Sequence, residues 1–390
     1  MKTKKPIRLG LVVPHIFLHR DILPNVIFSP GKLAIELAES LDQNDVDVTL
    51  FSPGPVETKV KNITADMSYF ENELKLRGDT YTDLLKKHPF TFVTLARQVQ
   101  AEIIAKAFAV ANNNELDIVH IYTNEEDLAL PFAQFCQEPV VFTHHDPFNF
   151  LVKYKNIFPK YSQLNWISMS LSQRKAMPKE TNWIANIYHG LGVDLFTPVN
   201  NPKNGYIAFL GRIIEPKGLH LAIEAVKKYN GTARQPLKLK VAGKHYAEHS
   251  KDSYWQKTIE PELNGLIEYV GFIKDVGAKN EFLGNAKALI IPSLFEEPFG
   301  MVMIEALACG TPLIGLDSGA IPEVIVQNKT GFIVDRTKDL QKMIDGLATA
   351  IGKVEEIDRK ACRQEFEDRF TLERMCTEHR QTYKRLLYTK

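Results

Sequence analysis

A single glutamate, Glu305, interrupts an otherwise apolar stretch that runs from Met301 to Ala308. A helix that is apolar on every side is buried, and a buried carboxylate is costly unless other groups satisfy it. A tight turn, residues 296–300, comes directly before this stretch, so the first amides of the helix are unpaired and available to a phosphate. The layout predicts a nucleoside diphosphate, with phosphate on these amides and ribose hydroxyls on Glu305. An acid paired within the fold is the structural alternative.

Two cations, Arg212 and Lys217, lie in the segment 211–218, between a predicted strand and a predicted helix. This position is the carboxyl end of the strand, where ligands bind in parallel sheets. An arginine fork and a lysine point charge together suit a diphosphate, whereas two solvated loop charges are the alternative. The segment has no GxGxxG pattern, which argues against a nicotinamide enzyme.

The adjacent histidines His144 and His145 follow another predicted strand. No third ligand is spaced nearby, so we predict no metal and expect a histidine that bonds a substrate hydroxyl or carbonyl. Gly31 opens a helix after a long loop, where a glycine lets the backbone approach a ligand; an ordinary helix start is the equal alternative. The motif at residues 45–47 looks like a metal-binding DxD, but its place before a strand predicts a turn.

The elements that position these residues form a repeating pattern. Short apolar runs alternate with helical patterns, which is typical of α/β domains with parallel sheets covered by helices. The pattern occurs twice, and a Gly-, Pro- and Asn-containing stretch at residues 186–205 separates the halves. Residues 56–89 are predicted to be irregular and residues 358–388 helical. The predicted strands are 7–13, 46–51, 117–121, 139–143, 166–169, 206–210, 237–241, 267–270, 288–291 and 312–314, and the predicted helices are 32–42, 92–111, 218–228, 276–283 and 301–308.

Composition indicates an ordinary globular protein of two domains. The chain has 390 residues, of which 44% are hydrophobic and 24% charged. Its 48 Lys and Arg nearly balance its 47 Asp and Glu, giving a net charge of +1, so nothing favours nucleic acid as a partner. The four cysteines are widely spaced, which suits a reducing, cytoplasmic location.

The basic N-terminus and the apolar run at residues 7–13 mimic a signal peptide. The run is short and has no small-residue cleavage site, so a first strand is predicted instead. No apolar run approaches the ~20 residues of a membrane span. Lys86, Lys87 and the N-terminal lysines are too sparse to argue for contact with a membrane surface.

Taken together, these residues resemble the GT-B glycosyltransferases, in particular the retaining group called family 4 (glycosyltransferase group 1). The resemblance covers nearly the whole chain and is strongest over residues 208–335. It is carried by the glutamate pair of the Glu-Pro-Phe-Gly segment (297 and 305), the Phe-Leu-Gly-Arg…Lys-Gly segment (209–218), the Tyr-Val-Gly-Phe segment (269–272) and the Gly-Ala-Ile-Pro-Glu-Val segment (319–324).

The resemblance implies two Rossmann-like, doubly wound parallel-sheet domains that face each other across a cleft. Residues 1–190 would form the acceptor-side domain and residues 191–371 the donor-binding domain. The C-terminal helix, residues 372–390, would pack back on the first domain.

The same resemblance assigns roles to individual residues. Glu305 would bind the ribose, and Arg212 and Lys217 the diphosphate. Glu297, with the backbone of Phe299 and Gly300, would meet the sugar hydroxyls. His145 would lie at the reacting face of the sugar, and the catalytic set would be Glu297, His145, Arg212 and Lys217. The remaining donor contacts would be Gly31 at the distal phosphate, Gly211, the amides of Met301 and Val302 at phosphate, and Gly271 and Phe272 at the base.

The implied activity is hexosyl transfer from a nucleotide sugar, expected to be a UDP-sugar, to an unidentified hydroxyl acceptor. The anomeric configuration would be retained by a front-face mechanism, with no metal or other cofactor. The chain departs from the family where Pro30 precedes Gly31 in place of a second glycine, and where His189-Gly190 replaces Asn-Gly. A GT-B-fold epimerase and a catalytically silent nucleotide-sugar-binding subunit are the alternatives.

Overall fold

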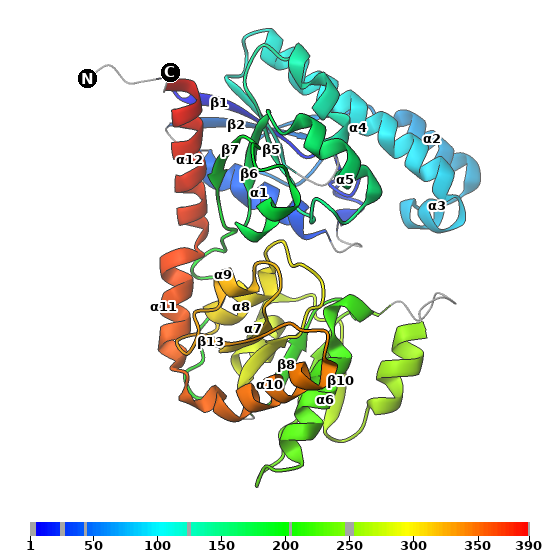
Figure 1. The fold of residues 1–390 in the computed structure, drawn as a ribbon. Coiled ribbons are helices and arrows are strands. Elements are labelled where there is room, and N and C mark those ends of the chain that lie inside the picture. Colours follow the sequence, from blue (N-terminus) through cyan, green and yellow to red (C-terminus); the bar gives the residue numbers. More distant parts are fainter. Residues whose placement is uncertain are drawn as a thin grey trace. The chain divides into compact units, whose positions relative to one another are not determined.

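The computed structural model describes residues 5–23, 28–42, 45–122, 126–202, 205–245 and 253–388; Met1–Lys4 of the basic N-terminus lie outside this set. Its contacts divide the chain into two units (Figure 1). Unit 1 comprises residues 1–169, 174–187 and 376–390, and unit 2 comprises residues 170–173 and 188–375. Each unit is an α/β domain built on a parallel sheet, so the predicted fold class is confirmed.

Unit 1 contains a 7-stranded parallel sheet with the order β3-β2-β1-β4-β5-β6-β7. The order reverses between β1 and β4, and ligands of such sheets bind beyond the carboxyl ends of the strands. The sequence did not predict β3 or β7. The strands are β1 (Ile7–Val12), β2 (Val46–Ser52), β3 (Lys61–Thr64), β4 (Ile118–Tyr122), β5 (Val140–Thr143), β6 (Asn165–Ser168) and β7 (Trp183–Asn186).

The prediction that residues 56–89 are irregular is wrong, because this region contains β3, α2 and α3. Helix α2 buries only Phe70 and Leu74, so its apolar stripe is too sparse to recognise. Helix α3 begins at a capping box between Thr80 and Asp83, a start signal that the sequence analysis did not use. The helices of this unit are α1 (Ser29–Leu41), α2 (Ser68–Arg77), α3 (Tyr81–Lys87), α4 (Pro89–Asn112) and α5 (Val152–Ile157).

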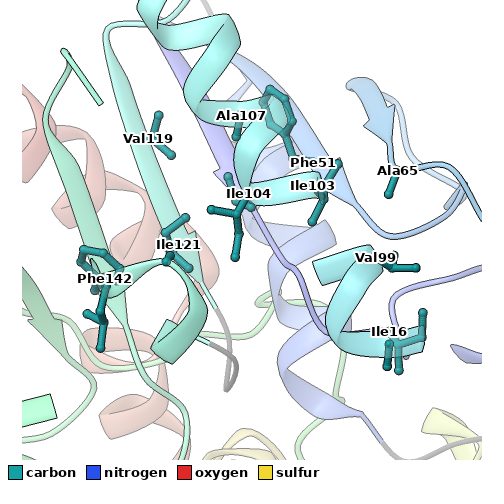
Figure 2. Packing of buried hydrophobic residues seen from close by; sticks show 14 of the residues in the cluster. Ile16, Phe51, Ala65, Val99, Ile103, Ile104, Ala107, Val119, Ile121 and Phe142 are labelled. Atoms are coloured by element: carbon teal, nitrogen blue, oxygen red, sulfur yellow. The ribbon is translucent and has the colours of Figure 1, made fainter. Parts of the chain in front are cut away.

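The long helix α4 supplies much of the core of unit 1. Its residues Val99, Ile103, Ile104 and Ala107 recur at helical spacing and are buried. Figure 2 shows this stripe against side chains of the sheet, which come from β2 (Phe51), β4 (Val119, Ile121) and β5 (Phe142).

Unit 2 contains a 6-stranded parallel sheet with the order β10-β9-β8-β11-β12-β13. Its order reverses between β8 and β11, the strands that precede residues 211–218 and 292–300. The sequence predicted every strand but β13. The strands are β8 (Ile207–Leu210), β9 (Leu239–Ala242), β10 (Ile267–Gly271), β11 (Ala288–Ile291), β12 (Leu313–Leu316) and β13 (Gly331–Val334), and the helices are α6 (Leu219–Asn230), α7 (Val276–Gly284), α8 (Met301–Ala308), α9 (Ile321–Val324) and α10 (Leu340–Lys353).

The helical tail is divided into α11 (Arg359–Arg369) and α12 (Leu372–Tyr388). At the break, the amide of Leu191 donates to the carbonyl of Phe370 at 2.9 Å, and Leu372 donates back to Leu191 at 2.8 Å. A Cβ on Gly190 would lie 2.2 Å from the carbonyl oxygen of Thr371, so glycine is required there. From Cys376 onward, α12 belongs to unit 1.

No helix in the described part of the chain has the length and apolar character to cross a bilayer. Shorter helical turns complete the fold. These turns are η2 (Glu126–Leu128), η3 (Leu130–Phe135), η4 (Phe158–Tyr161), η5 (Ser172–Ala176), η6 (Glu215–Lys217), η7 (Trp255–Ile259), η8 (Glu260–Glu262) and η9 (Val354–Glu356).

Two histidines of unit 1, the buried His120 and the half-buried His15, have lowered pKa values. His120 on β4 lies 2.8 Å from the Tyr383 hydroxyl of α12 and 2.8 Å from the Thr143 hydroxyl of β5, and burial lowers its pKa well below 6.5. His15 accepts the Phe17 amide at its Nδ1 atom, 3.2 Å away, and burial, with nearby Lys153, lowers its pKa to about 4. Both rings therefore favour the neutral form in the folded chain.

We expect the free energy of unfolding to fall on acidification below pH 6.5. A histidine with a lowered folded-state pKa stabilises the fold above its unfolded value and loses this contribution as the pH falls. Each such histidine should contribute a slope of about 1 kcal/mol per pH unit between pH 6.5 and 5. Denaturant unfolding at both pH values measures it. The variant His15→Asn keeps an acceptor for the Phe17 amide but does not titrate, so it should show a shallower slope; an unchanged slope would contradict this role of His15.

Candidate functional site

Glycine backbone lines the carboxyl ends of β8, β9 and β10 in unit 2. The amide of Gly243 donates to the carbonyl of Gly271 at 2.9 Å, and the amide of Gly211 donates to Ala242 at 3.1 Å. A Cβ on Gly243 would lie 1.8 Å from the carbonyl oxygen of Gly211. Gly271 has a φ of +85°, and the next residue, Phe272, is 42% exposed. The structure therefore brings the predicted residues Gly211 and Gly271 to one edge, where a ligand can approach the backbone closely.

The two predicted cations have different surroundings. Arg212 is exposed, and its guanidinium has no hydrogen bond or ion pair within the described ranges. Lys217 forms an ion pair with Glu297, which lies 80 residues further along the chain, and its Nζ atom is 5.3 Å from the centre of the Phe295 ring. Because β8 and β11 are neighbours in the sheet, the loops that follow them meet at this point.

The loop that carries Glu297 is fixed by a second loop, residues 318–320. The carbonyl of Glu297 accepts the amide of Ala320 at 2.8 Å, and the carboxylate of Glu296 accepts the amide of Gly319 at 2.8 Å. A Cβ on Gly319 would lie 2.2 Å from the amide nitrogen of Glu297. Ser293 donates to Glu297 Oε1 at 2.9 Å, so this buried carboxylate is held by both Ser293 and Lys217.

The first turn of α8 presents free amides, as predicted. Gly300 has a φ of +92° and caps the helix without a side-chain hydrogen bond. The first hydrogen bond of the turn runs from the Met303 amide to the Gly300 carbonyl at 3.0 Å. The amides of Met301 and Val302 have no acceptor among the described residues, which leaves them available to an anion. Phe299, in contrast, is a core residue whose ring packs 5.1 Å from that of His189.

Glu305 is buried in α8, with 7% of its surface exposed. Its Oε1 atom accepts from Nζ of Lys279, on α7, at 2.6 Å. Its Oε2 atom is buried and has no hydrogen-bond partner in the part of the chain that the structure describes. One carboxylate oxygen is therefore paired within the fold, which is the alternative considered in the sequence analysis. The other oxygen is an acceptor without a donor among the described residues. Leaving such a group unpaired costs about 1–3 kcal/mol.

The two histidines of unit 1 differ in their environment. His144 is fully buried among aromatic rings, with ring centres at 4.4 Å for Tyr154, 4.9 Å for Phe158 and 5.0 Å for Phe148. His145, 9% exposed, packs against the edge of Tyr122 at 4.5 Å. Both histidines are buried on the loop directly beyond the carboxyl end of β5, His144 completely and His145 with 9% of its surface exposed.

Gly31 lies in the first turn of α1, where a Cβ would be 2.5 Å from a ring carbon of Phe28 and 3.2 Å from a methyl of Leu18. Packing alone therefore requires glycine at this position.

The DxD motif begins in a turn at Asp45, as predicted, and Asp45 binds Lys384 at 2.6 Å. Within the described ranges, no three His, Cys, Asp or Glu side chains converge as metal ligands.

The sequence analysis missed the partners of the site residues. Glu323, on α9, accepts the amides of Leu171 at 2.8 Å and Ser172 at 2.6 Å, and the Tyr188 hydroxyl at 3.0 Å. Leu171, Ser172 and Tyr188 lie in unit 2, close to the points at which the chain crosses from one unit to the other. Their hydrogen bonds to Glu323 hold these segments in unit 2. Lys279 and Ser293, which hold Glu305 and Glu297, were also missed. Lys279 lies on a different helix from Glu305, so no local signal marks it, whereas Ser293 lies on the same loop as Glu297, four residues before it.

Residues 195–365, within unit 2, match the family model described as glycosyl transferases group 1. Among curated proteins, the chain is 22% identical over 269 residues to the putative glycosyltransferase YtcC of Bacillus subtilis. This match covers 63% of the chain and 65% of that relative, so the chain spans less than two thirds of the relative's length.

Solved structures of similar fold cover almost the whole chain. Sucrose-phosphate synthase from Thermosynechococcus elongatus is matched with a TM-score of 0.72 and 16% identity over 98% of this chain and 100% of that one. Anabaena Alr3699/HepE, in complex with UDP and glucose, is matched with a TM-score of 0.64 and 15% identity over 96% and 99%. The chain therefore has the GT-B fold of these proteins, and its segment 195–365 carries the match to the group 1 glycosyltransferases.

Proposed function

We propose that the protein transfers a sugar from a nucleoside-diphosphate sugar, with a UDP-sugar as donor, to an acceptor hydroxyl. The observation that carries the proposal is the buried Oε2 atom of Glu305, which lies in the same helix as the amides of Met301 and Val302; none of these three groups has a hydrogen-bond partner in the described part of the chain. Glu305 lies four positions beyond Met301 in the helix, a rise of about 6 Å. A phosphate on the amides therefore leaves a ribose hydroxyl within reach of the carboxylate.

The chemical role of the site is to stabilise a departing diphosphate. Arg212 is an exposed cation with no competing acceptor among the described residues, and preorganised positive charge stabilises the negative charge that develops on the leaving group. Lys217 is held beside Glu297, so the two act together, the lysine towards phosphate and the glutamate towards the sugar hydroxyls.

Transfer proceeds with retention of configuration and without a metal ion. The phosphate of the donor takes the proton of the acceptor hydroxyl, which attacks from the side of the leaving group. Positive charge from Arg212, Lys217 and the first turn of α8 takes the place of a metal. Support for UDP comes from a structural neighbour, Anabaena Alr3699/HepE, which is described in complex with UDP and with UDP-glucose.

The two alternatives differ from the transferase in what they do to the donor. An epimerase converts a nucleotide sugar without an acceptor, and a silent subunit binds it without turnover. The match of residues 195–365 to the group 1 glycosyltransferases supports the transferase.

The purified chain should be tested with a panel of UDP-, GDP- and ADP-sugars. We expect one nucleotide class, UDP, to raise the melting temperature and one UDP-sugar to be slowly hydrolysed to UDP and free sugar. Chromatography of the released sugar and of the remaining nucleotide sugar distinguishes hydrolysis from epimerisation. Conversion of the donor into a second nucleotide sugar would favour the epimerase, and stabilisation without any cleavage would favour the silent subunit.

A further inference from the structure

An arginine beyond the carboxyl end of β13 contacts the loop that carries Glu297. Arg336 lies two residues after the last residue of this strand. Its guanidinium donates to the carbonyl oxygen of Leu294 at 3.0 Å and to the hydroxyl of Ser318 at 3.1 Å, and it forms an ion pair with the carboxylate of Glu296. Because β11, β12 and β13 are neighbours in the sheet of unit 2, Arg336 joins the segments that follow these strands.

The contacts of Arg336 belong to a continuous series of hydrogen bonds along residues 294–297. Each of these residues is held at its carbonyl or its carboxylate, either by Arg336 or by the 318–320 loop. The contacts with that loop join the Phe295 carbonyl to the Ser318 hydroxyl at 2.7 Å, the Glu296 carboxylate to the Gly319 amide at 2.8 Å and the Glu297 carbonyl to the Ala320 amide at 2.8 Å. Arg336 reinforces both sides of this series, since it binds Ser318 as well as Glu296.

The ion pair of Arg336 contributes little to the stability of unit 2. The side chains of Arg336 and Glu296 are 33% and 47% exposed, and exposed ion pairs stabilise a fold only weakly. The planar guanidinium, in contrast, presents its donors in fixed directions, and these donors reach acceptors on both loops. Removal of Arg336 is therefore expected to shift the 294–297 loop without unfolding the domain.

We propose that Arg336 is a positioning residue for the donor sugar, because it fixes the backbone that carries Glu297. This inference rests on the proposed function, in which the Glu297 carboxylate meets the sugar hydroxyls. Ser293 and Lys217 bind that carboxylate directly, so they set its direction. Arg336 instead sets the position of the loop from which the carboxylate projects.

Recognition of the nucleotide half of the donor should not depend on Arg336. Within the described ranges, its side-chain hydrogen bonds go to residues 294, 296 and 318, none of which belongs to α8. The proposed contacts with ribose and with phosphate, in contrast, are made by Glu305 and by the first amides of α8. Loss of Arg336 should therefore weaken recognition of the sugar and leave recognition of UDP unchanged.

The variant Arg336→Met tests the inference with UDP and with the UDP-sugar that the parent chain cleaves. In calorimetric titrations, we expect the affinity for UDP to equal that of the parent chain. The affinity for the UDP-sugar should fall by about tenfold, and turnover by about tenfold or more, since a displacement of about 1 Å can cost on the order of 100-fold. Hydrogen exchange of the Gly319 and Ala320 amides should become faster even without a ligand, because these amides donate to the loop.

The matched control is Lys228→Met, which breaks the ion pair with Asp345 on the surface of unit 2, where the two side chains are 47% and 48% exposed. It should change none of these quantities. Arg336→Lys keeps the charge but loses the planar fork, so its effects should be intermediate. Combining Arg336→Met with Glu296→Gln should cost no more than Arg336→Met alone, because the effects of residues in one network do not add.

A fall in UDP affinity as large as the fall in UDP-sugar affinity would overturn the inference, because it would place Arg336 at the diphosphate. Unchanged turnover in Arg336→Met would also overturn it, whether or not hydrogen exchange becomes faster. If the parent chain cleaves its donor and Arg336→Met does so equally well, only the inference about Arg336 fails. If the parent chain cleaves no nucleotide sugar, the proposed function fails, and this inference fails with it.

Discussion

Replacing Arg212 by alanine is expected to slow donor cleavage by about 10²–10³-fold, the range for loss of one preorganised charge-stabilising donor. The guanidinium has no acceptor among the described residues, so its removal breaks no internal contact. The loss should therefore appear in turnover while the melting temperature stays within a degree or two of the parent chain, as for a surface substitution. Single-turnover hydrolysis of the UDP-sugar, followed by release of UDP, measures the rate.

Two further variants give the Arg212 experiment its controls. Arg234→Ala removes another exposed arginine of unit 2, which precedes the amino end of β9, and should leave the rate unchanged. Arg212→Lys keeps the charge but loses the bidentate fork, so its rate should lie between those of the alanine variant and the parent. If Arg212→Ala retains nearly full activity, the assigned role is wrong.

Patterns within one element of this chain were predictable, whereas contacts between elements were not. The apolar run before His145 and the helix around Glu305 could be recognised because strand and helix periodicity are local properties. The burial of Glu305 followed from the same periodicity, since its neighbours in the helix are all apolar. Helices α2 and α3 were missed because α2 buries few side chains and α3 is short. Neither helix therefore has apolar residues that recur clearly at helical spacing.

The partners of the site residues depend on the sheet order. Lys217 and Glu297 meet because β8 and β11 are adjacent in the sheet. Neither segment alone contains a sequence signal that predicts which strands are adjacent. The sequence assigned Lys217 to phosphate alone, but the structure places its charge beside a carboxylate. Gly31 shows a related limit. The sequence shows that residue 31 has no side chain, but only the structure identifies the Phe28 ring as the group with which a side chain would clash.

Replacing Glu305 by glutamine is expected to weaken UDP binding by about 10- to 100-fold, since a hydrogen bond to a charged group contributes about 1.5–3 kcal/mol. The amide has nearly the same shape as the carboxylate, but it loses the negative charge that accepts ribose hydroxyls. Calorimetric titration of UDP into parent and variant measures the change. A 2′,3′-dideoxy analogue of UDP should bind both proteins with similar affinity, because it lacks the hydroxyls that Glu305 would accept.

The ion pair with Lys279 offers the competing explanation for any effect of Glu305→Gln. If Glu305 acts only as the partner of Lys279, then Lys279→Met should reduce nucleotide affinity as strongly as Glu305→Gln does. If Glu305 binds ribose, Lys279→Met should lower the melting temperature, because it leaves a second oxygen of a buried carboxylate unpaired, yet preserve the discrimination between UDP and its dideoxy analogue. Loss of that discrimination in Glu305→Gln alone would assign the ribose to the buried oxygen that has no partner among the described residues. Its persistence in Glu305→Gln would place the ribose elsewhere.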